Sequence, residues 1–560
     1  MVRAAINSDF HALEIPLCMS TLRSKIALTG GSVVLYFLLV GWFQHWSGAS
    51  RAAFGGYPDE SSHYLSGLMI YDYGASGFST LPFPFAANYY THLPFFGIGY
   101  WPPFFYVLEA AWMAFFGFHR AAVLLLPALL AALLSGTVFW LLRDRLGAPA
   151  AFLTGCVLLL TPALLVSNTL IMVDNAFALF CFWGGLAFGR WIDTGSVRAA
   201  LLTGLLAALC LLTKINSIYL ILLPPIVFLI LGRWRLLLMR TFWIIPVVVA
   251  VLWGPWIFYT RKMISIGFGG LVRPTVLNIA TGVSLAMLNN LGWILILVLA
   301  GGAIALRNAR LDTSALVCAV LPVCYLVFLL AARVEIEDRF LIPILVPSVV
   351  LSGIALGAVS RKVAWVRLPP AGIATALSVV ILLSHASMLK GFTKSPPNPI
   401  RTVVDYIRER DGSEDAAVLV PSDAEGPFIA EFAADEKHRP LRFMVRPNKV
   451  LSVINWNGGS YQARFHDPAE LISLFDGLPI RYTVISSSID DRSRPDDRLL
   501  ASTMDAHPER WRRLDAPVGR WLVYERIDGR TATPDQMADI LSTFLTDRLK
   551  PLSPGSSGVQ

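Results

Sequence analysis

Long apolar segments recur along the first 390 residues of the chain, and they constrain its fold more than any other feature. A helix needs about 20 apolar residues to cross the hydrocarbon core of a bilayer. Candidate segments lie at residues 26–46, 121–142, 149–168, 171–189, 199–214, 217–232, 241–260, 285–306, 313–332, 340–358 and 371–389. The pattern predicts a polytopic α-helical membrane protein with about eleven transmembrane helices, and it excludes an ordinary soluble protein.

The charged residues divide the chain into two parts. Residues 1–390 contain 24 Lys or Arg and 13 Asp or Glu, a net charge of +11, whereas residues 391–560 contain 22 and 25, a net charge of −3. We expect a cytoplasmic N-terminus (1–25), a transmembrane domain (26–390), a Pro-rich hinge (391–400) and a small water-soluble domain (401–560). The excess cations lie between apolar segments, where they orient a membrane protein, so nucleic acid is excluded as a partner.

A twelfth apolar stretch, residues 102–118, is shorter and begins with two prolines. If it crossed the bilayer, the Lys and Arg clusters at 233–240 and 361–367 would lie outside, against the positive-inside rule. We therefore expect it to form an outer juxtamembrane helix within a first outer loop, 47–120. The N-terminus is then cytoplasmic, the C-terminal domain lies on the outer side, and the first apolar segment is a retained anchor.

The first outer loop contains a group of chemically versatile residues, Tyr57-Pro58-Asp59-Glu60-Ser61-Ser62-His63-Tyr64. Proline followed by aspartate is typical of a helix start, so Asp59 is either a simple N-cap or a functional carboxylate. The neighbourhood favours function, because a second carboxylate, a histidine and a tyrosine follow within five residues. Beside a bilayer, Asp59 is suited to take a proton from a hydroxyl or amine that attacks a sugar carbon.

Two more ionisable residues lie at the outer ends of predicted spans. Asp174 begins the fourth span, where it either interacts with the helix dipole or serves a binding site. Lys214 ends the fifth span, where it either snorkels to the lipid headgroups or serves such a site. A charge at a membrane boundary costs desolvation energy unless it is paired or hydrated, so both are candidate functional residues.

The loop from Arg333 to Arg339 contains five charged residues between two spans. It is either a solvated hairpin with local ion pairs or part of a binding site. Arg339 directly precedes a span, so its guanidinium is placed to bind phosphate oxygens while a lipid tail lies along the helix. Outer carboxylates for proton transfer, together with outer cations for phosphate, indicate a reaction on a lipid phosphate.

Four segments together resemble the GT-C superfamily of membrane glycosyltransferases, of the protein O-mannosyltransferase and lipid A aminoarabinose transferase type. They are Pro58-Asp59-Glu60 with Tyr64, Trp101-Pro102-Pro103-Phe104-Phe105-Tyr106, Ile171-Met172-Val173-Asp174-Asn175-Ala176-Phe177 and Arg339-Phe340-Leu341-Ile342-Pro343. The resemblance covers most of residues 20–390. The chain departs from the family pattern at Thr169, where members often carry Arg, and at Trp101, where they have His.

The resemblance implies a GT-C-like glycosyltransferase that moves a sugar from a polyprenyl-phosphate donor to an acceptor on the outer face of the inner membrane, with inversion at the anomeric carbon. Asp59 is implied as the general base, with Glu60 and Asp174 orienting the acceptor or tuning the base. The expected donor-phosphate ligands are Lys214, Arg333 and Arg339, and the expected sugar or acceptor contacts are His63, Tyr64 and Trp101. Similarity to bacterial members implies that the outer compartment is the periplasm.

The expected partners are membrane lipid, the lipid-linked donor, and an acceptor that is a cell-envelope glycan, lipid A or a protein. The sequence has neither His/Cys metal-ligand spacing nor a nucleotide-binding glycine loop, so no metal or other cofactor is firmly implied, although outer carboxylates are able to recruit a divalent cation. The alternatives are a transporter or lipid flippase, and an inert envelope scaffold. Ionisable residues at the outer ends of the spans, rather than near the midplane, favour the transferase.

The C-terminal part predicts an extracytoplasmic α/β domain. Helices are expected at 400–410, 468–476 and 496–506, and strands at 416–420, 441–445, 450–454, 482–486 and 521–526. A turn at Trp456-Asn457-Gly458-Gly459 either contacts a sugar or is an ordinary loop. No catalytic residue is expected in this domain.

Overall fold

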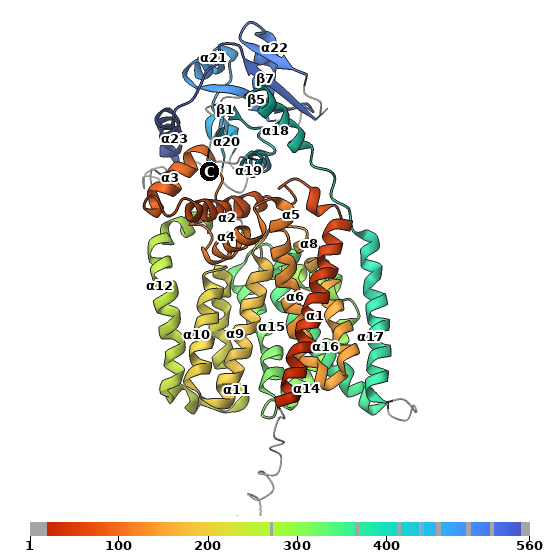
Figure 1. Ribbon diagram of the computed structural model, residues 1–560. Coiled ribbons are helices and arrows are strands. Elements are labelled where there is room, and N and C mark those ends of the chain that lie inside the picture. Colours follow the sequence, from red (N-terminus) through yellow and green to blue (C-terminus); the bar gives the residue numbers. More distant parts are fainter. Residues whose placement is uncertain are drawn as a thin grey trace, which may run out of the picture.

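The chain folds into three layers: a bundle of long helices, a layer of short helices across one end of it, and an α/β domain above them (Figure 1). This computed structural model describes residues 19–268, 273–363, 369–411, 416–435, 439–440, 442–454, 461–488, 494–515 and 520–549. The turn at 456–459 lies outside the described residues.

The bundle follows the apolar segments of the sequence. Its elements are α1 (Met19–Trp46), α6 (Leu125–Leu146), α7 (Ala148–Leu159), α8 (Pro162–Ser167), α9 (Asp174–Thr194), α10 (Val197–Leu211), η2 (Ile215–Leu222), α11 (Leu223–Leu231), η3 (Trp234–Leu238), α12 (Arg240–Phe268), α13 (Val276–Leu291), α14 (Ile294–Arg307), α15 (Thr313–Ala332), η4 (Asp338–Leu341), α16 (Ile342–Lys362) and α17 (Pro370–Ala386). The central helix is α16, which is almost entirely buried because its neighbours cover every side of an apolar sequence.

Five described helical segments are long and apolar enough to cross a membrane unaided: 23–46, 120–146, 240–264, 313–332 and 338–362. Of the remaining predicted spans, 171–189 falls on α9, a continuous helix of 21 residues outside that set, and the others coincide with shorter or interrupted apolar helices. The number of eleven crossings therefore stays a prediction. The expected span at 285–306 is not one straight helix. It is divided between α13 and α14, which meet at 102°, because Gly292 takes a positive φ of 53° between them.

The layer of short helices corresponds to the predicted first outer loop. It comprises η1 (Ala49–Arg51), α2 (Glu60–Ala75), α3 (Pro82–His92), α4 (Phe104–Phe116) and α5 (Arg120–Val123). Figure 1 shows α2 and α4 lying across the ends of the upright helices. The stretch 102–118 therefore lies across the end of the bundle, packed against α2 rather than aligned with the long helices.

The C-terminal domain is an α/β fold, as the sequence predicts. After η5 (Ser387–Gly391) come α18 (Pro399–Arg410), β1 (Ala417–Leu419), α19 (Glu425–Asp435), β2 (Phe443–Val445), α20 (Pro447–Val450), β3 (Ser452–Val453), β4 (Gln462–Ala463), α21 (Pro468–Gly477), β5 (Ile480–Ser486), α22 (Pro495–Ala506), β6 (Trp511–Leu514), β7 (Trp521–Arg526) and α23 (Pro534–Leu549). The main sheet has the order β2-β1-β5-β7-β6. Its first three strands are parallel, and β7 pairs antiparallel with both β5 and β6.

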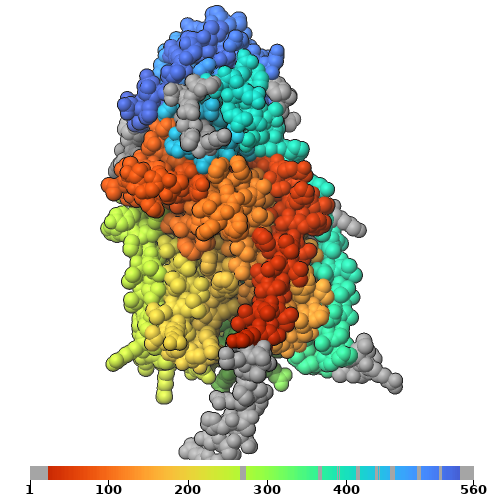
Figure 2. Space-filling model, in the orientation of Figure 1, coloured from red at the N-terminus to blue at the C-terminus, as the bar shows by residue number. Residues whose placement is uncertain are grey.

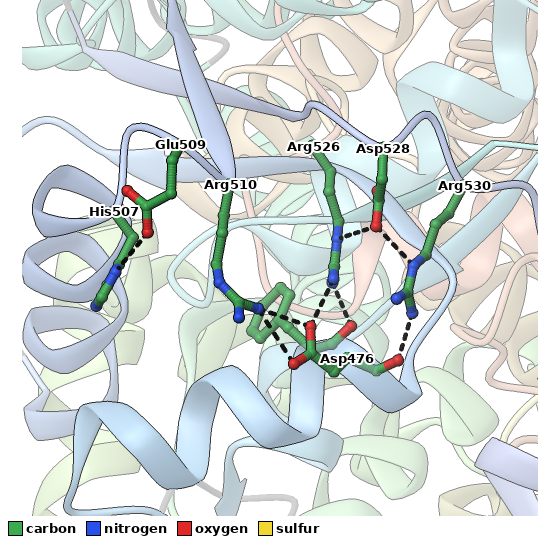
Figure 3. Close-up of polar contacts among 8 residues, drawn as sticks. Asp476, His507, Glu509, Arg510, Arg526, Asp528 and Arg530 are labelled. Carbon is green, nitrogen blue, oxygen red and sulfur yellow. Dashed lines mark hydrogen bonds and ion pairs between the residues drawn. The ribbon is translucent and has the colours of Figure 1, made fainter.

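A group of arginines ties helix α21 to the strands of this domain. Arg510 and Arg526 both donate to the Asp476 carboxylate at the end of α21, at 2.9 and 2.7 Å (Figure 3). Arg526 and Arg530 also share Asp528, at 3.0 and 2.9 Å. These contacts tie α21 to the β6–β7 hairpin, and none of them reaches the helical layer.

The C-terminal domain and the helical layer share one hydrophobic core. Tyr64, Leu65 and Leu68 of α2 belong to the same buried cluster as Phe428 and the other apolar residues of α19. Figure 2 shows the blue domain seated directly on the red and orange layer. The sequence did not predict α19, because this helix is buried on nearly all sides and so lacks an alternating polar face.

Candidate active site

Asp59 stands at the N-cap of α2, the position that the sequence predicts. Among the described residues its side chain makes no capping hydrogen bond, so the carboxylate is available for other contacts. It keeps 37% of its side chain exposed, at the boundary between the helical layer and the outside. Burial of the group raises the pKa of Asp59, because lost solvation outweighs the attraction of Arg339 and Lys214.

Asp174 and Lys214 form a buried ion pair below Asp59. Asp174 is the first residue of α9, and Lys214 lies in an extended conformation between α10 and η2. The Lys214 Nζ atom is 2.7 Å from Asp174 Oδ1, and the two side chains are 2% and 1% exposed. Lys214 therefore does not snorkel. Its ammonium lies 4.7 Å from the centre of the Phe340 ring and 5.5 Å from that of Trp101, where the ring faces favour a cation.

Arg339 connects three carboxylates. It lies in η4, immediately before α16, and donates from Nε to Glu337 Oε2 at 2.7 Å. One terminal nitrogen is 3.4 Å from Asp174 Oδ2 and the other is 3.7 Å from Asp59 Oδ2. The guanidinium also stacks on the Tyr57 ring, 4.0 Å from its centre.

We refer to Asp59, Asp174, Lys214, Glu337 and Arg339 as the charged cluster. With all five groups ionised it carries three negative and two positive charges. Each member lies at the start or end of a helix or in the turn beside one, on four separate parts of the chain. Glu337 and Tyr57 were not predicted as site residues. Tyr57 donates to Glu337 Oε1 at 2.8 Å across 280 positions, and only the tertiary fold could show this pairing.

Glu60 faces away from the charged cluster, although it follows Asp59 directly. Its side chain is fully buried and lies 2.6 Å from Arg120, a residue of α5. The backbone N–H groups of Gly56 and Ile171 also donate to its carboxylate, each at 3.1 Å. These contacts tie α2 to α5 and to the segment before α9, which is an architectural role.

The three predicted sugar or acceptor contacts divide between two places. His63 is fully buried, with Nδ1 3.0 Å from the hydroxyl of Tyr106 and its ring 5.3 Å from that of Trp101. Both His63 and Trp101 therefore border the charged cluster through Lys214. Tyr64 instead belongs to the core shared with the C-terminal domain, and its hydroxyl donates to Phe118 O at 2.9 Å.

Arg333 is not joined to the charged cluster by any ion pair among the described residues. It is exposed and caps the C-terminus of α15 in a left-handed conformation, φ 52°. The structure thus brings together Asp59, Asp174, Lys214 and Arg339 from the predicted set, and it places Glu60, Tyr64 and Arg333 elsewhere.

Across the described ranges, no three His, Cys, Asp or Glu residues are grouped to hold a metal ion.

Comparison with known proteins bears on the fold. Residues 101–259 match the family model described as dolichyl-phosphate-mannose-protein mannosyltransferase. The structure is similar to ArnT from Cupriavidus metallidurans in the apo state, with a TM-score of 0.57 and 16% identity over 88% of this chain and 98% of that chain. ArnT bound to undecaprenyl phosphate gives a TM-score of 0.56 with the same identity and coverage.

A second fold relative is the archaeal oligosaccharyltransferase AglB from Archaeoglobus fulgidus, solved in complex with an inhibitory peptide and a dolichol-phosphate. Its TM-score is 0.50 and its identity 14%, over 81% of this chain and 69% of that chain. A search of curated protein sequences gives no match. The resemblance to GT-C membrane glycosyltransferases, inferred from four short motifs, is confirmed by the family model and by the fold.

Proposed function

We propose that this chain, which has a GT-C fold, transfers a sugar from a polyprenyl-phosphate donor to an acceptor on the outer face of the inner membrane. The observation that carries the proposal is the charged cluster. It combines a partly exposed carboxylate with two buried cations at the ends of apolar helices. The fold relatives add support, because one is bound to undecaprenyl phosphate and another to a dolichol-phosphate.

The donor phosphate is bound by Lys214 and Arg339 in this proposal. Both cations are already held by Asp174, which keeps them together when no ligand neutralises them. The two terminal nitrogens of Arg339 make only long contacts, 3.4 Å to Asp174 and 3.7 Å to Asp59. Their N–H groups are therefore suited to donate to phosphate oxygens. Arg333, being exposed and distant from these contacts, has no direct role in this proposal.

Asp59 is the general base in this proposal. Its raised pKa makes it a stronger base than an ordinary aspartate, which suits it to proton abstraction from a hydroxyl or amine. The acceptor oxygen or nitrogen forms a bond to the anomeric carbon as the bond to the phosphate oxygen breaks. Attack from the side opposite the phosphate inverts the anomeric carbon.

Charge is balanced during this step. The phosphodiester of the donor carries one negative charge and the departing phosphate carries two, while Asp59 loses its negative charge by taking the proton of the acceptor. The total charge of cluster and phosphate therefore stays the same. Lys214 and Arg339 stabilise the new charge on the phosphate without having to move. Asp174 holds these two cations in place and is a positioning residue.

The position of the cluster supports transfer rather than transport. Its members occupy helix ends next to the layer of short helices, not the middle of the bundle. Transport sites lie near the bilayer midplane. The position of the cluster at helix ends therefore favours a transferase over a transporter or flippase. We place the C-terminal domain in the periplasm, above the site. The acceptor is a glycan, a glycolipid or a protein presented from that side.

The test is sugar transfer from a labelled polyprenyl-phosphate donor pool in membranes that contain the wild type or the Asp59→Asn variant at equal abundance. We expect the variant to lose at least about 99% of the rate, since general base catalysis contributes roughly a hundredfold to ten-thousandfold. Glu335→Gln is the matched control, because Glu335 is an exposed carboxylate in the outer loop before η4. Full activity in Asp59→Asn would assign the base elsewhere, and absence of transfer in the wild type would contradict the function.

A further inference from the structure

His63 carries a polar atom that nothing in the described part of the chain satisfies. The side chain is fully buried, and its Nε2 atom has no hydrogen-bond partner there. A buried donor or acceptor without a partner destabilises the protein, so such an atom beside a candidate site points to a bound group that completes it. The sequence placed His63 among general sugar contacts, whereas the structure allows a more specific assignment.

The hydrogen bonds around Tyr106 determine which nitrogen of His63 carries the proton. The Tyr106 hydroxyl lies 3.0 Å from His63 Nδ1. Its other polar neighbour, Ser66, donates to the Ser62 carbonyl and already accepts from the N–H groups of Gly97 and Ile98. We infer that Tyr106 donates its proton to Nδ1. The hydrogen of the neutral imidazole is then on Nε2, as an unpaired N–H donor.

The imidazole lies at the edge of the charged cluster. Its ring packs edge-on against Trp101, 5.3 Å between centres, and the Lys214 ammonium faces the same Trp101 ring at 5.5 Å. The charges of Asp174, Arg339 and Lys214 all act on His63. Burial lowers the pKa of His63 to about 3, so the ring stays neutral at physiological pH.

We propose that the Nε2–H group of His63 donates a hydrogen bond to a phosphate oxygen of the lipid-linked donor, as an uncharged third ligand beside Lys214 and Arg339. This assignment rests on the proposed function and goes beyond it by naming a phosphate contact that carries no charge. A third cation at this position would bind the doubly charged product more strongly than the singly charged donor. A neutral donor orients the phosphate without adding that preference, so it favours release of the product.

The experiment measures binding rather than transfer. Purified full-length protein in detergent is titrated with polyprenyl phosphate and, separately, with the sugar-linked donor, by isothermal titration calorimetry. For His63→Leu we expect affinity for both ligands to fall roughly tenfold to a hundredfold, as for loss of a hydrogen bond to a charged group. His63→Gln, whose amide can place an N–H group near the Nε2 position, should recover most of the affinity.

Two further variants make the result specific. In Tyr106→Phe the imidazole proton of His63 is free to move from Nε2 to Nδ1. We therefore expect weaker binding of both ligands although the His63 side chain is retained. His45→Leu, an exposed histidine of α1, should bind as the wild type does. Melting temperatures of all variants identify any loss of folding.

The outcomes separate this assignment from the function on which it rests. Unchanged affinity in a folded His63→Leu variant would overturn the assignment and leave the transferase proposal intact. Weaker binding of the sugar-linked donor alone would overturn the phosphate contact in favour of a sugar hydroxyl. A wild type that binds neither ligand would overturn the proposed function itself.

Discussion

Asp59 and Glu60 are adjacent carboxylates with opposite surroundings. Asp59 is partly exposed and makes only a long contact with Arg339, whereas Glu60 is buried and fully occupied by Arg120 and two backbone N–H groups. One residue of displacement on a helix turns a side chain by about 100°, which is enough to direct one carboxylate into the site and the other into the framework. Removing Glu60 would therefore act on folding, not on chemistry.

The pH dependence of transfer should follow Asp59. Its pKa is raised by burial, and Glu337 raises it further by like-charge repulsion. Because the base must be deprotonated, kcat/KM should fall as the pH drops through this raised pKa, at a higher pH than for an ordinary aspartate. Glu337→Gln removes the repulsion and should move this acid limb to lower pH. An acid limb that stays in place would show that another group controls it.

The sequence predicts which ionisable residues come together in the charged cluster better than it predicts their contacts. Asp59, Asp174, Lys214 and Arg339 could be chosen because each is an ionisable residue at the end of an apolar segment. Glu337 was overlooked as a site residue although it lies two positions before Arg339, because its importance comes from Tyr57, 280 positions away. Glu60 and Tyr64 were assigned to chemistry because sequence proximity does not reveal the direction of a side chain.

At the scale of elements, the segment before α2 and the 3₁₀ helix η4 form one side of the site together. The Tyr57 hydroxyl donates to Glu337, and the Tyr57 ring covers the Arg339 guanidinium that Glu337 also binds. Tyr57 and Glu337 therefore hold Arg339 in one orientation. This bridge was not predictable, whereas most helix positions were, because periodicity reports local structure and not contacts between distant loops.

Tyr57→Phe should weaken donor binding without abolishing transfer. The variant loses one hydrogen bond to Glu337 but keeps the ring over Arg339, so we expect KM for the donor to rise about twofold to tenfold with a smaller change in kcat. Tyr73→Phe is the matched control, since Tyr73 donates to Thr80 O at 3.0 Å on an exposed part of the helical layer. Equal effects of the two substitutions on KM would contradict the role of the bridge.

At the scale of the whole molecule, the C-terminal domain is fixed to the helical layer by a buried ion pair. Arg439 donates from Nε and from a terminal nitrogen to the two oxygens of Asp72, at 2.9 and 3.0 Å. Tyr89 donates to the same carboxylate at 2.8 Å. The sequence predicted the hinge at 391–400 and a soluble domain beyond it, but not this attachment, because an exposed arginine and a buried one look alike in a sequence.

Arg439→Ala should loosen the domain. Removing one partner of a buried ion pair costs about 3 kcal/mol or more, so the detached state should become on the order of a hundredfold more populated. Limited tryptic cleavage at Lys394, an exposed residue of the hinge, would measure this change. Arg530→Ala is the control, since its contacts with Asp476 and Asp528 stay within the C-terminal domain (Figure 3). Cleavage at the wild-type rate would show that the shared hydrophobic core suffices for attachment.

Helix α2 has Asp59 at its first end and Asp72 near its last, about 20 Å apart along a continuous helix. A helix of this length is stiff, so the two carboxylates move together along its axis. A displacement of the C-terminal domain along the axis of α2 would therefore move Asp59 relative to Arg339 and change the 3.7 Å distance between them. The carboxylate of the charged cluster and the carboxylate that fastens the C-terminal domain thus belong to one rigid element.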